Sequence, residues 1–402
     1  MDRTSLLPTP FRERKSRPAV VLASGGGPYD NTVSALERMD LSPVRGKRVL
    51  LKSNAGREVE PETGVTTHPQ VVAAAIDAFV DAGADVAVGE SPITGVNALD
   101  AFDRCGIKKV AEERNCPLID MDERRYVSMK IPDGVAIRKL KVCRDVLEHD
   151  IIVSIPVMKM HMHTGVTLAV KNMKGCLWRR SKVDLHMLPR LPDTNEKTLD
   201  IAIADMSAVL RSHLAIVDGT IGMEGLGPSA GKAKEMDVVL AGIDPFAADA
   251  VACTLMGVSP HDIPHLRIGA DRGYGIIDID RIDVYPEDWK MAGRPFELPP
   301  ENLSIEFPGV TVLDEQSCSA CQSTLLLLLQ RHGDELFRNR PEATTINIAI
   351  GKGHETVPAD TLCIGNCTAK LKKGRPFVSG CPPVASEILD VYAEYYKPKT
   401  AS

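Results

Sequence analysis

The sequence predicts an α/β protein in which mostly parallel sheets are flanked by helices, with a smaller C-terminal α/β segment that carries cysteines. Short apolar runs rich in β-branched residues, such as 151–157, alternate with stretches of helix length. Of the 402 residues, 44% are hydrophobic, 25% are charged and only 4% are aromatic. This composition is typical of a soluble α/β protein, and the length allows a large core.

The first half of the chain repeats a strand–helix–strand pattern with polar residues at the strand ends. Strands and helices are expected, in order, at 18–27 (a strand with its glycine turn), 31–39, 48–51, 69–82, 84–90, 98–114 and 117–120. Lys52 and Asn54 follow the third of these elements, and His68 precedes the fourth. Open α/β sheets bind ligands at the carboxyl ends of their strands, so these three residues are candidate substrate-binding residues.

The segment 151–176 begins with a strand that is expected to be buried on both faces. If the chain stays extended beyond it, the period of two places Lys159, His161 and His163 on one face and three methionines on the other. These three polar residues are the candidate catalytic residues, because histidine and a buried lysine exchange protons near neutral pH.

The same segment is expected to turn helical at 164–165, which would place Thr167, Lys171 and Lys174 on one helix face. Burying neighbouring lysines costs free energy unless an anion compensates their charge. The three residues are therefore candidate ligands of an anionic small-molecule substrate or cofactor. The alternative is that the methionines pack in a core and the cations line a solvated rim.

Further along, the α/β pattern continues through a helix at 200–210, a strand that ends at Asp218 and a helix that follows Asp244. Asp218 and Glu224 are candidate acid/base or metal-binding carboxylates, or turn carboxylates that bind local N–H groups. Prolines then accumulate without periodicity, which indicates a linker. The expected parts are an N-terminal extension at 1–17, a main α/β domain at 18–282, a linker at 283–310 and a C-terminal α/β iron–sulfur segment at 311–402.

Five of the ten cysteines lie in the last 85 residues. Cys318 and Cys321 flank the start of an expected helix, Cys367 follows a Gly-Asn turn, and Cys381 precedes a proline. Helix N-terminal N–H groups stabilise thiolates, and a Cys-Pro pair is a recurring ligand setting in ferredoxins. These four thiols predict one [4Fe–4S] cluster, while Cys363 is expected to point into the sheet. A four-thiolate zinc site and packed free thiols are the alternatives.

The net charge of the chain and the hydropathy of its sequence exclude some classes of binding partner. The net charge of −6 argues against nucleic-acid binding, and the sequence holds no apolar stretch of the roughly 18 residues that span a bilayer. The first residues scatter charges among prolines and do not resemble a signal peptide. We therefore expect a cytoplasmic protein with neither a nucleic-acid nor a membrane partner.

Several stretches resemble the uncharacterised family called domain of unknown function 362, over about residues 18–280. They are VLLKSN at 49–54, TTHP at 66–69, VGES at 88–91, PVMKMHMHTGVTLAVKNMKG at 156–175, IVDGTIGMEGLGP at 216–228 and IDPFAADAVA at 243–252. The family's motif positions map onto Lys52, Asn54, His68, Lys159, His161, Lys171, Asn172, Asp218, Asp244 and Asp249. The resemblance implies a fold but no substrate.

The C-terminal CSAC, IGNC and GCPP resemble the cysteine-bearing extension of archaeal and anaerobic bacterial members, which are often described as iron–sulfur proteins. The chain lacks the tandem ferredoxin cysteines that many relatives carry, so at most one cluster is expected.

Three functions follow as hypotheses. The first is a cytoplasmic iron–sulfur oxidoreductase whose cluster exchanges electrons with an anionic substrate or cofactor held near 159–174. The second is an isomerase or racemase in which His161 and His163 act as an acid/base pair or bind a metal, while the cluster is structural. The third is a non-catalytic electron-transfer subunit that binds a redox protein partner.

Overall fold

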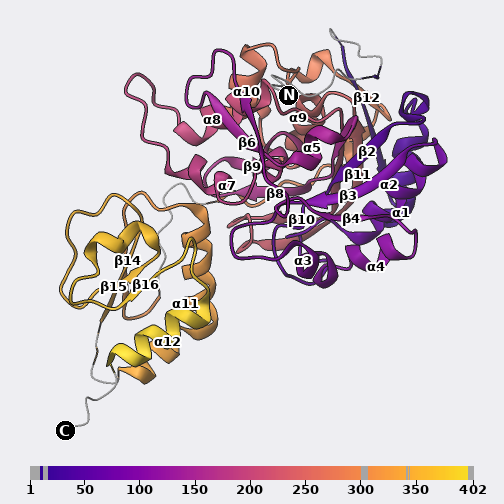
Figure 1. Ribbon diagram of the computed structural model, residues 1–402. Coiled ribbons are helices and arrows are strands. Elements are labelled where there is room, and N and C mark those ends of the chain that lie inside the picture. The colour runs from indigo at the N-terminus through magenta and orange to yellow at the C-terminus, as the bar shows by residue number, and fades with distance from the viewer. Residues whose placement is uncertain (1–9, 12–16, 300–306, 341–342, 344, 397–402) are drawn as a thin grey trace. The chain divides into compact units, whose positions relative to one another are not determined.

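The computed structural model describes the chain except for residues 1–9, 12–16, 300–306, 341–342, 344 and 397–402. It comprises two compact units, one of residues 1–227 and 231–298 and one of residues 228–230 and 299–402. Each unit combines helices with a sheet (Figure 1). The N-terminal extension expected at 1–17 lies almost wholly outside the described residues.

The first unit is built on a ten-stranded sheet. Its main path runs in the order β12 (Asp283–Tyr285), β1 (Ala19–Ser24), β11 (Lys232–Gly242), β10 (Leu214–Glu224), β7 (Ile151–Ser154), β2 (Arg48–Lys52), β3 (Asp85–Glu90) and β4 (Leu118–Asp120). Pairing is parallel from β10 to β4, whereas β11 is antiparallel to β1 and β10. Off this path, β8 (Val157–His161) pairs with β10 and with β9 (Gly165–Thr167). The predicted mostly parallel α/β fold is confirmed.

Helices cover both faces of this sheet, so each face has its own core. One face packs against α1 (Gly27–Glu37), α2 (Pro69–Asp81), α3 (Ala98–Arg104) and α4 (Ile107–Glu112). The other packs against α5 (Arg144–Glu148), α6 (Ala169–Asn172), α8 (Thr198–Ser207), α9 (Pro245–Leu255) and α10 (Pro264–Asp271). In β2, Val49 and Leu51 join the first core and Leu50 joins the second. Burial on both faces explains why these strands are continuous apolar runs.

Three elements differ from the sequence-based expectation. Helix α1 begins at Gly27, and Asn31, expected to cap it, lies inside the helix and donates from Nδ2 to Asp237 Oδ1 at 2.8 Å. The helix expected at 98–114 is broken at Gly106, whose φ of +78° ends α3 and starts α4. Strand β10 continues past Asp218, because it forms a long hairpin with β11.

Part of the segment expected as a linker, 283–310, is folded into the first unit. Strand β12 at its start pairs with β1 in parallel, with Val284 opposite Val20. Trp289 is buried in the same core. The division between the units falls after Leu298, and residues 300–306 lie outside the described part of the chain.

The second unit holds four parallel strands, β13 (Val310–Asp314), β14 (Ile346–Ile350), β15 (Leu362–Ile364) and β16 (Phe377–Val378). Helices α11 (Ser319–Asn339) and α12 (Ala385–Tyr396) pack on each other. Cys318, Cys367 and Cys381 follow the carboxyl ends of β13, β15 and β16, which lie at one edge of the sheet. No helix in the described ranges is long and apolar enough to cross a bilayer.

Candidate functional site

Four cationic side chains meet near the carboxyl ends of β2 and β3. Lys52 ends β2, Arg57 lies in the loop that follows, Lys159 lies on β8, and Lys171 lies on α6. The charges of Arg57 and Lys52 lower the pKa of Lys159, and the charge of Lys159 in turn lowers the pKa of Lys171. We call these four residues the cation cluster. Two of its members, Lys52 and Lys159, are at most 3% exposed.

Lys52 is neutralised by a carboxylate inside the protein. Its Nζ lies 2.7 Å from Glu90 Oε1, and both side chains are almost fully buried. Glu90 also accepts hydrogen bonds from the backbone N–H groups of Ala55 (2.9 Å) and Ser91 (2.8 Å). A Cβ on Gly175 would lie 2.7 Å from both charged atoms, so only glycine leaves room for this pair. Lys52 and Glu90 thus form a buried ion pair that neutralises both charges without a ligand.

No carboxylate in the described part of the chain lies within hydrogen-bond distance of Lys159. Its Nζ donates to Asn54 Oδ1 (3.0 Å) and to the carbonyl of Val65 (2.7 Å), which are both neutral acceptors. Burial, followed by the positive charge of Arg57, lowers the pKa of the Lys159 ammonium to about 7. At neutral pH this amine therefore exchanges a proton readily.

Arg57 is half-buried and makes neither a hydrogen bond nor an ion pair with any residue in the described ranges. Burial lowers the pKa of its guanidinium to about 10. A desolvated guanidinium without a counter-ion is costly unless an anion binds it. The buried hydroxyl of Ser53, in the same loop, also lacks a hydrogen-bond partner among the described residues.

The two remaining candidate lysines contact other polar side chains. Lys171 is 8% exposed and donates from Nζ to Thr167 Oγ1 at 3.0 Å. Burial and the charge of Lys174 lower the pKa of Lys171 well below its usual value. The continuous helix expected from 164–165 is wrong, because β9 and a bend precede α6; the turn nevertheless brings Thr167 and Lys171 together. Lys174 Nζ contacts the ring of His186.

His161 and His163 do not share a strand face, because β8 ends at His161 and His163 lies in the following turn. The backbone N–H groups of His163 (3.1 Å) and Thr164 (3.3 Å) donate to His161 Nδ1. Burial and the nearby cations lower the pKa of the His161 ring, which keeps it neutral. A neutral ring whose Nδ1 accepts hydrogen bonds carries its proton on Nε2. His161 therefore offers an N–H donor to an anion.

Asparagine side chains fix the walls of the site. Asn54 Nδ2 donates to Asn172 Oδ1 at 3.0 Å, and Asn172 Nδ2 donates to Ser154 Oγ at 3.1 Å. Asp249 binds the first N–H groups of α6, those of Ala169 (2.7 Å) and Val170 (2.9 Å), and so positions the helix that carries Lys171.

His68 has a structural position at the start of α2. Its Nδ1 accepts from the N–H of Gln70 (3.1 Å), and its own N–H donates to Asp218 Oδ2 (2.7 Å). Its Nε2 lies 3.8 Å from the exposed Glu62 carboxylate. None of these three contacts involves a residue of the cation cluster, although the charge of Asp218 acts on Lys159. Glu224 likewise binds Lys234 Nζ (2.7 Å) and stands apart from the cluster.

Sequence reasoning missed Arg57 and Glu90 as parts of the site. Glu90 ends the strand next to β2, and the register that pairs Lys52 with Gly89 places its carboxylate beside Lys52. That strand-end position was a usable signal. Arg57 lies in an irregular loop, where no periodicity indicates which side chain turns inward.

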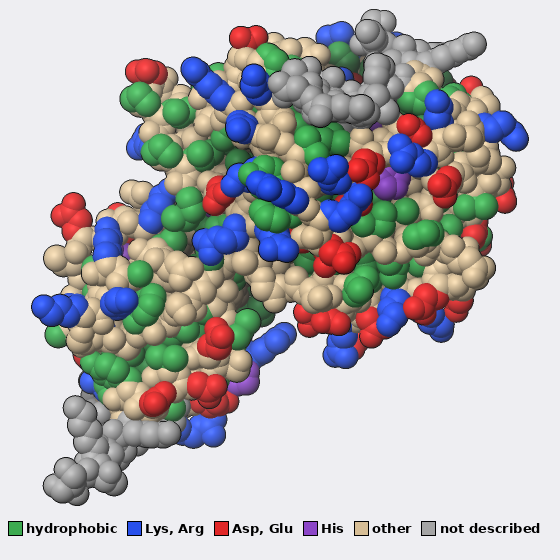
Figure 2. Space-filling model, viewed as in Figure 1, with side chains coloured by type: hydrophobic (Ala, Val, Ile, Leu, Met, Phe, Trp, Pro, Cys, Tyr) green, Lys and Arg blue, Asp and Glu red, His purple; other side chains and the backbone are tan. Residues whose placement is uncertain are grey.

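The surface near the site is electropositive. Figure 2 shows lysine and arginine side chains gathered on the face of the first unit over the area where Figure 1 labels β6 (Lys139–Val142), β8 and β9. Such a field raises the local concentration of anions although the whole chain carries a net charge of −6.

The second unit brings its four candidate cysteines within electrostatic reach of one another. The Cys318 thiol, together with burial and the more distant Cys381 and Cys367, raises the pKa of the Cys321 thiol. Burial and Cys318 also raise the pKa of Cys367. Within the described ranges, however, no three His, Cys, Asp or Glu side chains are arranged as ligands of one metal ion.

Backbone contacts join the loops that carry these cysteines. The N–H of Asn366 donates to the carbonyl of Gly380, and the N–H of Gly380 donates to Asn366 Oδ1, each at 2.9 Å. Gly365 has a φ of +88°, and a Cβ there would lie 3.4 Å from Cys321 Sγ. Cys363 is fully buried in β15, and its thiol donates to the carbonyl of Thr361 (3.7 Å).

The lowered pKa of Lys159 predicts a pH-dependent stability. Between pH 7 and 10.5 the unfolded chain keeps a proton that the folded chain has lost, so the free energy of unfolding should rise with pH by up to about 1.4 kcal/mol per unit. Lys159→Met should remove this contribution, and Lys139→Met, at an exposed position, should retain it. Urea unfolding at pH 7.5 and 9 measures the difference. An equal rise in Lys159→Met would contradict the assignment.

Comparisons with known proteins identify a family and two similar proteins. The family described as Domain of unknown function (DUF362) matches residues 49–254. The thylakoid-associated protein sll1697 of Synechocystis sp. (strain ATCC 27184 / PCC 6803 / Kazusa) is 28% identical over 219 residues, which are 54% of this chain and 66% of that protein. The lactate racemase apoprotein of Thermoanaerobacterium thermosaccharolyticum is 14% identical with a TM-score of 0.38, over 62% of this chain and 59% of that one. The chain thus covers less than two thirds of the length of either protein.

Proposed function

The chain belongs to the family of the domain of unknown function 362, and we propose that it is an iron–sulfur oxidoreductase that acts on a small anionic substrate. The observation that carries the proposal is the pair Arg57 and Lys159, two desolvated cations with no carboxylate hydrogen-bonded to either among the described residues. The proposal has two parts, a substrate site in the first unit and a cluster in the second.

The cation cluster suits a carboxylate or a phosphate. Arg57 would bind two oxygens of such a group, because its planar guanidinium donates two parallel hydrogen bonds. Lys159 and the Nε2–H of His161 would supply further donors. Lys52 is excluded from this role because Glu90 already neutralises it.

Lys159 is the proton-transfer group in this proposal. Because its pKa is about 7, its Nζ is protonated in some molecules and neutral in others at physiological pH. A bound anion would raise this pKa and favour the protonated form. Lys159 would then release the proton as an electron arrives on the substrate.

The cysteines of the second unit supply the donor set for one [4Fe–4S] cluster. Cys318, Cys321, Cys367 and Cys381 would hold it, since four thiolates are its usual ligands. When bound, the cluster supplies single electrons to or from the substrate. The mutual raising of thiol pKa values supports this assignment, because crowded thiolates need a compensating positive charge.

The test is anaerobic purification followed by metal and sulfide analysis. We expect about four iron and four sulfide per chain, and an electron paramagnetic resonance signal after reduction with dithionite. A chain that holds zinc alone, or no metal, would overturn the redox proposal. The substrate part is tested separately. Added oxalate or phosphate should raise the melting temperature of the protein, and Arg57→Ala should abolish this stabilisation without changing the iron content.

The alternative reading is an isomerase or racemase with a structural cluster. It is favoured by the pKa of Lys159 near 7 and by the neutral His161 ring on the same strand, which could act as an acid/base pair. Turnover that needs no reductant and persists after the cluster is removed would select this alternative.

A further inference from the structure

The first unit also holds a cavity away from the cation cluster. It has a volume of about 740 Å³, within the range of small-molecule sites. Its lining includes Ser212, just before β10, and Asp244, just after β11. Because β10 runs parallel to β7 and β2, this cavity lies at the amino ends of those strands, on the opposite edge from Lys52.

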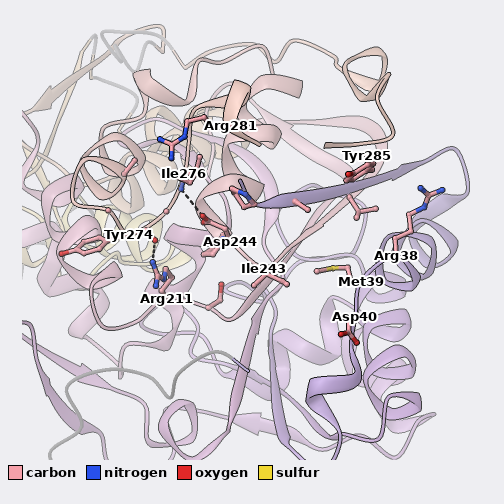
Figure 3. Close-up of a pocket in the computed structure, with 18 residues that line it drawn as sticks. Arg38, Met39, Asp40, Arg211, Ile243, Asp244, Tyr274, Ile276, Arg281 and Tyr285 are labelled. Carbon is pink, nitrogen blue, oxygen red and sulfur yellow. Dashed lines mark hydrogen bonds between the residues drawn. The ribbon is translucent and has the colours of Figure 1, made fainter. Parts of the chain in front are cut away.

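Three arginines line the cavity, and no carboxylate pairs with any of them in the described part of the chain. All three are exposed; Arg38 and Arg281 form no side-chain hydrogen bond or ion pair there, while Arg211 donates to the carbonyl of Tyr274 and its charge acts on the Asp244 carboxylate. Figure 3 shows Arg211 and Tyr274 on one side of Asp244, with Arg38 and Tyr285 on the other.

The two carboxylates of the cavity are bound by backbone groups. Asp244 accepts from the N–H groups of Phe246 (2.8 Å), Ala247 (3.3 Å) and Ile276 (3.1 Å). Asp40 accepts from the N–H of Ser42 at 3.0 Å. Three guanidinium groups thus face two carboxylates that backbone N–H groups already bind, which leaves an excess of positive charge in the lining of the cavity.

Ser212 lines the cavity with atoms other than its hydroxyl oxygen, which is buried and makes no hydrogen bond to any described residue. The polar contacts of a ligand would therefore come from the arginines.

We propose that this cavity binds an amphipathic small anion, with an apolar or aromatic body and one carboxylate or phosphate group. The arginines would hold the anionic group. Met39, Ile243, Tyr274 and Tyr285 would contact the body, since aromatic and aliphatic side chains form a large share of the lining. This site is separate from the proposed substrate site and does not depend on it.

The test measures binding of defined probes to the full-length, anaerobically purified protein by calorimetry. Adenosine monophosphate and indole-3-acetate serve as the phosphate and carboxylate probes, with adenosine and indole-3-acetamide as their neutral counterparts. We expect at least one anionic probe to bind to a single site, and its neutral counterpart to bind at least about tenfold more weakly. Equal affinity for the neutral form, or no saturable binding of either anion, would overturn the proposal.

Single-residue substitutions test where the anionic probe binds. Arg211→Ala should weaken binding of the anionic probe about tenfold, while Arg138→Ala, at an exposed position outside the cavity, should not change it. Arg57→Ala should also leave the affinity unchanged, and a loss there instead of in Arg211→Ala would place the probe in the cation cluster and overturn the proposal.

Discussion

Replacing Lys52 with methionine should lower the free energy of unfolding of the first unit by about 3–5 kcal/mol. The change leaves Glu90 as a buried carboxylate without its cation, 2.7 Å from where Nζ had been. The N–H groups of Ala55 and Ser91 would still bind Glu90, but they do not carry a full compensating charge. Tryptophan fluorescence in urea isolates this unit, because both tryptophans, Trp178 and Trp289, lie in it.

Two controls test whether the loss of stability in Lys52→Met comes from the buried, unpaired charge of Glu90 or from the loss of an ion pair alone. The double variant Lys52→Met with Glu90→Gln should be less destabilised than the sum of the single variants, because neither charge is left alone. Arg104→Met breaks a pair of similar length, 2.8 Å to Glu60, but both of its side chains are 60% exposed. Its expected cost is about 0.5 kcal/mol or less. Equal costs for Lys52→Met and Arg104→Met would show that the Lys52–Glu90 pair is hydrated.

The strands of the first unit could be predicted because burial on two faces requires continuous apolar runs, which are visible in the sequence. The runs at 49–51 and 151–153 are apolar without alternation, and each places successive side chains in opposite cores. Polar residues at the ends of such strands, among them Lys52 and Asn54, could then be assigned to one edge of the sheet. The family assignment from the same motifs is confirmed.

The details of the site depend on irregular backbone, which periodicity does not describe. The turn after His161 takes His163 off the strand face, because its N–H binds back to His161 Nδ1. His68 caps α2, an interaction that its position before Pro69 also allowed. Arg57 reaches Lys159 from a loop without regular structure. The first two placements follow from contacts over two residues that a strand pattern does not describe, and the third follows from a tertiary contact.

The pairing of Lys52 with Glu90 also explains why the site combines stability with unpaired charge. One lysine of the cation cluster has a fixed counter-ion, so the strand ends are held together without a ligand. Lys159 and Arg57 keep their charges available, at a cost in desolvation that an anion would offset. A site of this kind should bind its ligand more tightly than a surface of exposed lysines, which hydration and salt weaken.

The cysteine variants should give the second large effect. Cys321→Ala should reduce the iron of the anaerobically purified protein from about four per chain to a small fraction of that value, because its thiol lies among the other three. Cys363→Ala is the matched control. Both residues are at most 4% exposed and lie in the second unit, so both changes remove a buried thiol from a packed environment.

The two variants separate ligation from packing. If Cys321 is a ligand, Cys321→Ala loses iron and sulfide together with the dithionite-induced signal, and Cys363→Ala keeps them. Cys367→Ala and Cys381→Ala should resemble Cys321→Ala, since the Asn366–Gly380 contacts hold their loops together. Loss of iron in Cys363→Ala with retention in Cys381→Ala would reassign the ligand set. Because β13, β15 and β16 end at one edge, that result would also require the loops beyond them to rearrange when the cluster binds.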